Sequence, residues 1–106
     1  MARRPEPTTP WSKNGAGLAD QAIKDKPGIV YSIDVSWTGA AAGDLIHIED
    51  ALSADAGNAK IHTIRLDAAV GKYNAVLPSV GLRAAIGIWA NLQLTGANIA
   101  INVGYD

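Results

Sequence analysis

A regular alternation of apolar and polar residues between positions 28 and 37 constrains the fold more than any other feature of this sequence. The first series of alternating residues is Ile29, Tyr31, Ile33, Val35 and Trp37, and the second is Val30, Ser32, Asp34 and Ser36. Successive side chains of a β-strand point to opposite faces of a sheet, so a period of two predicts a strand with one buried face. We therefore expect the first series to lie in a core and the second to face away from it.

Strand patterns recur along the rest of the chain at intervals of roughly ten residues. They are predicted at residues 18–24, 44–50, 59–66, 70–78, 82–89, 90–95 and 98–105. Short helices are the alternative at residues 18–26 and 51–59, although Pro27 and Gly57 would keep both of them short. About eight short strands separated by small-residue turns indicate an all-β protein, an antiparallel β-sandwich of jelly-roll-like form.

Two of these strands, at residues 44–50 and 59–66, form a predicted hairpin. If its loop is centred between Ala54 and Asp55, the register of the two strands follows. The facing pairs are then Asp44 with Arg65, His47 with His62, Ile48 with Ile61, and Glu49 with Lys60. This register brings together two pairs of opposite charge and one β-branched pair, which favours it, although a slip of two residues would preserve the faces.

The first 17 residues are predicted to form an extended N-terminal arm, followed by a single β-sandwich domain at residues 18–106. The arm holds three of the five prolines, which fix the backbone dihedral φ and prevent pairing as a central strand. A disordered terminus is the alternative. Trp11 favours an ordered arm, because an indole is costly to leave in water and serves well as an anchor in a neighbouring surface.

Four residues are candidates for an interface with another protein: Arg3, Arg4, Trp11 and Trp89. Trp89 follows Ile86 and Ile88 on the opposite parity, so it is expected to face outward. An outward Trp89 together with Tyr73 leaves a carbohydrate-binding module open as a second function, because aromatic rings stack against the apolar faces of sugars.

The two histidines are the sharpest candidates for chemistry. Facing positions on antiparallel strands place their Cβ atoms about 5 Å apart, so His47 and His62 could share a metal ion with Glu49 or Asp50 as a third ligand. The competing interpretation places both imidazoles on a solvated face. The acidic residues lack the ligand ladder of a calcium loop, and the chain has no cysteine. We predict no metal, no cofactor and no enzymatic activity.

Charge and hydropathy bear on the possible partners. The formal net charge is −1 and the cationic side chains are scattered, which argues against a nucleic-acid partner. No apolar run approaches the ~20 residues that span a bilayer, and residues 1–10 lack the apolar segment of a secretory signal. We therefore expect no membrane partner, and a soluble protein that is made and used without export through the general secretion route.

Three stretches of the sequence carry a resemblance to a known family. They are residues 27–39, residues 45–50, and the series Leu77, Pro78, Gly81, Leu82, Gly87, Ile88 and Trp89 with residues 95–97. Over roughly residues 15–105 the chain resembles capsid decoration or cement proteins of tailed bacteriophages, which have a β-sandwich or jelly-roll fold. The resemblance implies a structural virion protein on the capsid exterior, made in the host cytoplasm. It implies the major capsid protein as partner and a homo-oligomer, a trimer or dimer; a tail, neck or fibre component is the alternative.

Overall fold

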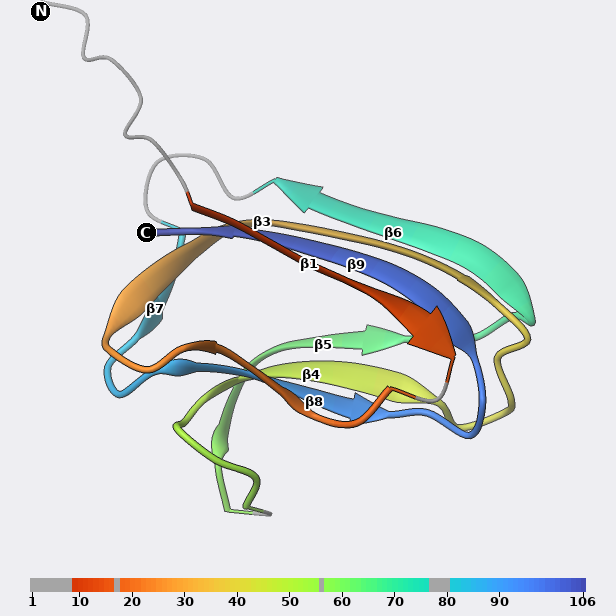
Figure 1. Cartoon of the computed structure of the whole chain (residues 1–106), viewed down its shortest axis with the longest axis horizontal. Coiled ribbons are helices and arrows are strands. Elements are labelled where there is room, and N and C mark those ends of the chain that lie inside the picture. The colour runs from red at the N-terminus through yellow and green to blue at the C-terminus, as the bar shows by residue number, and fades with distance from the viewer. Residues whose placement is uncertain (1–8, 17, 56, 77–80) are drawn as a thin grey trace, which may run out of the picture.

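The computed structural model describes residues 9–16, 18–55, 57–76 and 81–106, which form two antiparallel sheets stacked face to face (Figure 1). This confirms the prediction of an all-β sandwich. The described residues contain nine strands and no helix, hence no helix long and apolar enough to cross a membrane. The strands are β1 (Thr9–Ala16), β2 (Gln21–Lys24), β3 (Gly28–Thr38), β4 (Leu45–Asp50), β5 (Ala59–Arg65), β6 (Val70–Val76), β7 (Leu82–Ala84), β8 (Ile88–Gln93) and β9 (Asn98–Tyr105).

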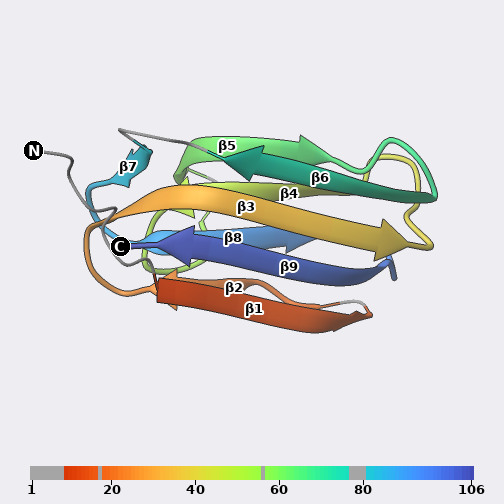
Figure 2. The same ribbon diagram turned by 90° about the horizontal axis from the view of Figure 1, so that it is seen from above.

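The order of the strands is that of a jelly roll. The five-stranded sheet has the order β1-β9-β3-β6, with β7 also paired to β3, and the four-stranded sheet has the order β2-β8-β4-β5. Figure 2 shows the two layers from above. In the described chain, β4 and β5 are the only consecutive strands that pair with each other; most other connections cross from one sheet to the other. Such interleaving of two antiparallel sheets defines the jelly-roll architecture.

Aliphatic side chains from the facing sides of both sheets make the core. The largest fully or almost fully buried ones are Val30, Ile33, Val35, Ile46, Ile48, Ile64, Ile88, Ile99, Ile101 and Val103. β-branched side chains suit this place because they are stiff and fit against a pleated surface. Trp37 is also buried, and its indole N–H donates a 2.9 Å hydrogen bond to the carbonyl of Ala68.

The alternation in β3 is interrupted, which corrects part of the sequence prediction. From Ile33 to Trp37 the predicted inward series is buried, but Val30, which was predicted to face outward, is fully buried. The pairing of β3 with β9 shifts by one residue between Val30 and Ser32, so Tyr31 is an extra residue in the strand. A bulge of this kind reverses the facing of every residue on one side of it. Ile29 and Tyr31 are accordingly half-buried and lie outside the core cluster.

The predicted hairpin of β4 and β5 exists, but its register is correct only near the loop. Glu49 faces Lys60 as predicted, whereas a shift between Ile48 and Glu49 leaves Ile61 unpaired. Beyond that shift the facing pairs are Leu45 with Arg65, His47 with Thr63, and Ile48 with His62. The predicted pairs of Asp44 with Arg65, Ile48 with Ile61, and His47 with His62 are therefore wrong. One extra residue in β5, a bulge, is the physical cause.

The predicted N-terminal arm contains a strand that begins at Thr9. Residues 1–8, with Arg3 and Arg4, lie outside the described residues. Residues 9–16 form β1, which pairs with β9 along its whole length and is the first strand of the five-stranded sheet. Pro10 lies in this terminal strand, where a residue without an N–H group is tolerated.

The strand predicted at residues 82–89 is in fact two strands separated by a turn. Both carboxylate oxygens of Asp50 accept hydrogen bonds from this turn, from the N–H groups of Ala85 at 3.0 Å, Ile86 at 2.7 Å and Gly87 at 3.3 Å. Asp50 ends β4 and faces Ile88, the first residue of β8. Its carboxylate thus satisfies backbone donors that would otherwise pair within a strand, and it fixes where β8 begins.

Replacing Asp50 by alanine should destabilise the fold by about 2 kcal/mol, because three backbone N–H groups lose a charged acceptor. Urea unfolding of Asp50→Ala and of wild type, followed by circular dichroism, measures the difference. Asp34→Ala is the matched control, since Asp34 is exposed on the outer face of the other sheet, and it should change stability by less than about 0.5 kcal/mol. Equal stability of wild type and Asp50→Ala would show that the turn forms without the carboxylate.

Candidate functional site

The outer face of the four-stranded sheet carries three of the residues that the sequence singled out, Trp89, His47 and Glu49. Cross-strand pairing sets Glu49 beside Trp89, His47 beside Asn91, and Leu45 beside Gln93. We call this surface the Trp89 face; its members are Leu45, His47, Thr63, Arg65, Trp89, Asn91 and Gln93. It arises because the residues of β4, β5 and β8 with the opposite parity fill the core.

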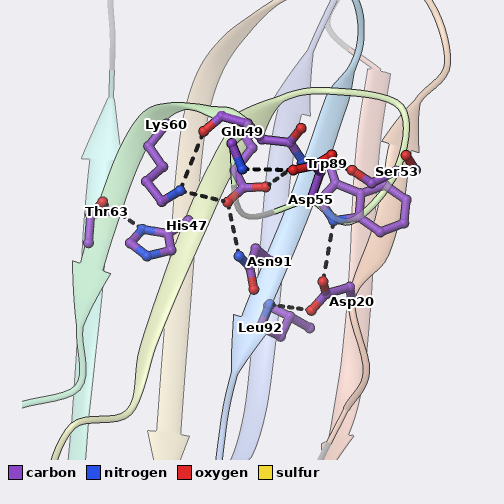
Figure 3. A network of polar contacts seen from close by, with 12 residues as sticks. Asp20, His47, Glu49, Ser53, Asp55, Lys60, Thr63, Trp89, Asn91 and Leu92 are labelled. Atoms are coloured by element: carbon purple, nitrogen blue, oxygen red, sulfur yellow. Dashed lines mark hydrogen bonds and ion pairs between the residues drawn. The ribbon is translucent and has the colours of Figure 1, made fainter.

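Trp89 is half-buried on this face, and its indole is held in place. The indole N–H lies 3.4 Å from Oδ2 of Asp20, and Oδ1 of the same carboxylate accepts a 2.9 Å hydrogen bond from the N–H of Leu92 (Figure 3). Asp20 therefore ties the segment before β2 to β8 and fixes the orientation of the ring. The sequence predicted that Trp89 faces outward, but it carried no signal for the partnership with Asp20, 69 positions away.

Glu49 is fully buried, although it belongs to the outer side of its sheet. Oε1 accepts a 3.1 Å hydrogen bond from Nδ2 of Asn58, and Oε2 accepts one of 2.9 Å from Nδ2 of Asn91. Nζ of Lys60 lies 3.5 Å from Oε2. Asn58 belongs to the loop at residues 51–58 and also donates to the carbonyl of Ser53 at 2.7 Å, so the loop folds back over the carboxylate (Figure 3).

The pKa of Glu49 lies below its ordinary value of 4.5. Burial raises the pKa, but hydrogen bonds from Asn91 and Asn58 and the charge of Lys60 lower it by more. The anion is thus the form that the folded protein stabilises. Its oxygens are occupied by groups from the loop, from β5 and from β8, so the anion joins these three segments.

The two histidines lie on opposite faces of the sheet, so the alternative of a metal ion shared between them is wrong. His47 is on the Trp89 face, with Nδ1 2.8 Å from the hydroxyl oxygen of Thr63. Burial and the charge of Lys60 lower its pKa. His62 faces Ile48 on the core side, and its Nε2 lies 2.6 Å from the hydroxyl of Tyr73 in the other sheet. Within the described ranges, no three His, Asp or Glu side chains are arranged to hold a metal ion.

Asp44 joins two loops, which the sequence did not reveal. Oδ2 accepts a 3.0 Å hydrogen bond from the N–H of Ala41, and Oδ1 accepts one of 2.8 Å from the hydroxyl of Thr95. These bonds lower the pKa of Asp44. An aspartate that closes a glycine-containing loop is typical of a side chain that accepts from the backbone nearby, and this pattern was the available signal.

Trp11 and Tyr73 point into the molecule. Trp11 faces the buried Val103 across β1 and β9 and packs, partly buried, against the core. Tyr73 is partly buried against the same core and bonded to His62, so it does not share a surface with Trp89. Of the four interface candidates, Trp89 is the one that the described residues place on an outer face.

The Trp89 face offers an indole, two amide side chains and the exposed guanidinium of Arg65 to a partner. Trp and Arg are enriched among the residues that dominate binding energy at protein interfaces. No protein-family model matches the chain, and no curated protein or solved structure matches it. The geometry of this face is therefore the basis for assigning a function.

Glu49→Gln should lower stability at pH 7 by about 1–3 kcal/mol, because an amide cannot accept at both positions that Asn58 and Asn91 occupy. The effect should depend on pH. Since the pKa of Glu49 is lowered on folding, the stabilisation by its anion is complete above pH 4.5 and is lost as the pH falls through the lower pKa of the folded state.

Urea unfolding across the acid range tests this prediction, with the exposed Asp34→Asn as the control for a generic loss of charge. The stabilities of wild type and Glu49→Gln should converge as the pH falls below 4.5. Parallel curves throughout would show that Glu49 does not bind its proton more weakly in the folded state.

Proposed function

We propose that this chain is a structural protein of a tailed-bacteriophage virion, a decoration or cement protein that binds the major capsid protein and performs no catalysis. The resemblance in the sequence supports the assignment to this family. The jelly-roll order of the strands is in keeping with it. The Trp89 face is the surface that we assign to the capsid.

The observation that carries the proposal is the placement of Trp89. Its ring stands half-exposed on a sheet face that also carries the polar side chains of Asn91, Gln93 and Thr63. A large anchor within a polar rim is the usual anatomy of a protein interface, in which one or a few residues supply most of the affinity. The anchor is fixed by Asp20, so little conformational entropy is lost when it binds.

A small binding face of modest affinity is sufficient for a protein that binds a capsid. Many copies of a decoration protein bind one shell, and any contact between them raises the effective concentration of the next copy. The low net charge favours contact with a protein shell over contact with a nucleic acid.

Trp89→Ala should raise the Kd for capsids by roughly 30-fold or more, as expected for the loss of a dominant anchor. The assay is co-sedimentation with capsids that the encoding phage assembles without this protein. Asn74→Ala, on the outer face of the other sheet, should remain within about twofold of wild type. Absence of the chain from purified virions, or equal binding of wild type and Trp89→Ala, contradicts the proposal.

Carbohydrate is a second candidate partner, because Trp89 shares its face with the amides of Asn91 and Gln93, which could bond to sugar hydroxyls. A glycan array probed with wild type and Trp89→Ala distinguishes the two functions. Signals that vanish in Trp89→Ala would favour sugar binding. An array without signals would rule out carbohydrate as the partner.

A further inference from the structure

Three large apolar side chains are more than half exposed in the described part of the chain. They are Leu52 at 54%, Ile86 at 53% and Val70 at 66%. None of them belongs to the Trp89 face. Single exposed apolar residues are common, but these three are grouped at two places in the fold.

Leu52 and Ile86 lie at the same end of the sandwich, where the N–H of Ala51 donates a 3.1 Å hydrogen bond to the carbonyl of Gly87, and we call these two side chains the apolar knob. A β-carbon built on Gly87 would lie only 2.7 Å from Cδ2 of Leu52, so Leu52 covers the turn that carries Ile86. Asp50 binds the N–H groups of this turn, including that of Ile86 itself. The knob is therefore held by hydrogen bonds while its side chains remain exposed, which preserves them for a contact at little cost in entropy.

Val70 lines an open hollow of about 500 Å³ at the far end of β3, which we call the Val70 hollow. Its lining consists of Trp37, Val70, Gly71, Ile99 and Ala100 together with the polar residues Asn14, Ser36, Thr38, Lys72 and Asn98, and most of the exposed lining is apolar. A cavity of roughly 150 Å³ accepts a group as large as benzene. The Val70 hollow thus has room for an isoleucine and a leucine side chain.

The knob and the hollow lie at opposite ends of β3. Gly28 begins β3 and pairs with Ala84, two residues before Ile86, whereas Trp37 and Thr38 end the strand and line the hollow. The 11 residues of β3 cover roughly 33 Å at about 3.3 Å per residue. A chain cannot fill its own hollow with its own knob across that length.

One side chain of opposite charge is available at each place. Lys72 lines the hollow and is exposed, and the exposed Asp55 lies in the same loop as Leu52. We propose that the occupant of the Val70 hollow is the Leu52–Ile86 knob of a second copy of this chain. This contact buries all three exposed apolar side chains at once. It uses neither Trp89 nor a capsid, so it stands independently of the proposed function.

The contact is heterologous, because one surface meets a different surface on the next copy. Each copy retains a free knob or a free hollow unless a ring closes, so association proceeds head to tail and rises with concentration. A two-fold symmetric dimer, in contrast, would use the same patch on both copies. The experiment below distinguishes the two arrangements by altering the knob and the hollow separately.

Two variants each remove one half of the contact: Ile86→Asp in the knob and Val70→Asp in the hollow. Both side chains are exposed, so circular dichroism should show a wild-type fold and melting temperature. Asn102→Asp, exposed on the outer face of the five-stranded sheet and outside the hollow, controls for the added charge. Light scattering coupled to size exclusion gives the mass in solution at concentrations up to about 1 mM, where even weak contacts are populated.

Wild type and Asn102→Asp should exceed the 11.0 kDa of one chain increasingly with concentration, while each of the two variants alone should remain at 11.0 kDa. An equimolar mixture of the two variants should form a species of twice that mass and no larger one, because only one intact knob and one intact hollow can meet. A wild type of 11.0 kDa at every concentration, variants that still associate, or a mixture that remains monomeric would each overturn the proposal.

Discussion

Three carboxylates at the two ends of β4 hold together loops that the strand order would otherwise leave apart. Most connections of a jelly roll cross between sheets that lie about 10 Å apart, so loops from distant parts of the sequence meet at the ends of the sandwich. Asp44 joins the loop before β4 to Thr95, Glu49 joins the loop after β4 to β8, and Asp50 holds the turn between β7 and β8. Charged acceptors make the stronger kind of hydrogen bond, and folding lowers all three pKa values. The loops therefore depend on the anionic forms.

The architecture could be predicted from the sequence because it depends on short-range patterns. The alternation from Ile33 to Trp37 places those side chains in the core without reference to any other part of the chain. The bulges at Tyr31 and Ile61 could not be predicted, since an extra residue leaves the local pattern nearly unchanged and shows only when the partner strand is known. The turn at residues 85–87 was missed for a related reason, because the carboxylate that fixes it is 35 or more positions away.

The candidate site shows how far a small error in register extends. A shift of one residue in β5 moves His62 from the outer face to the core side, where Tyr73 binds it, and separates it from His47. The prediction that Trp89 faces outward is confirmed, because it depends only on the alternation within its own strand. The roles of Asp20, Asn58 and Asn91 could not be read from the sequence, because each consists of a partnership between residues on different strands or loops.

The same carboxylates support the surfaces that we assign to partners. Glu49 holds the loop that carries Leu52 and, through Asn91, a part of the Trp89 face. Asp50, the next residue, holds the turn that presents Ile86. An apolar side chain on a mobile loop would lose conformational entropy on binding, whereas one on a hydrogen-bonded loop has lost it already during folding. Two adjacent acidic residues at the end of β4 thus both stabilise the sandwich and order the two surfaces before they bind. A change that loosens one of these loops should therefore weaken folding and assembly together.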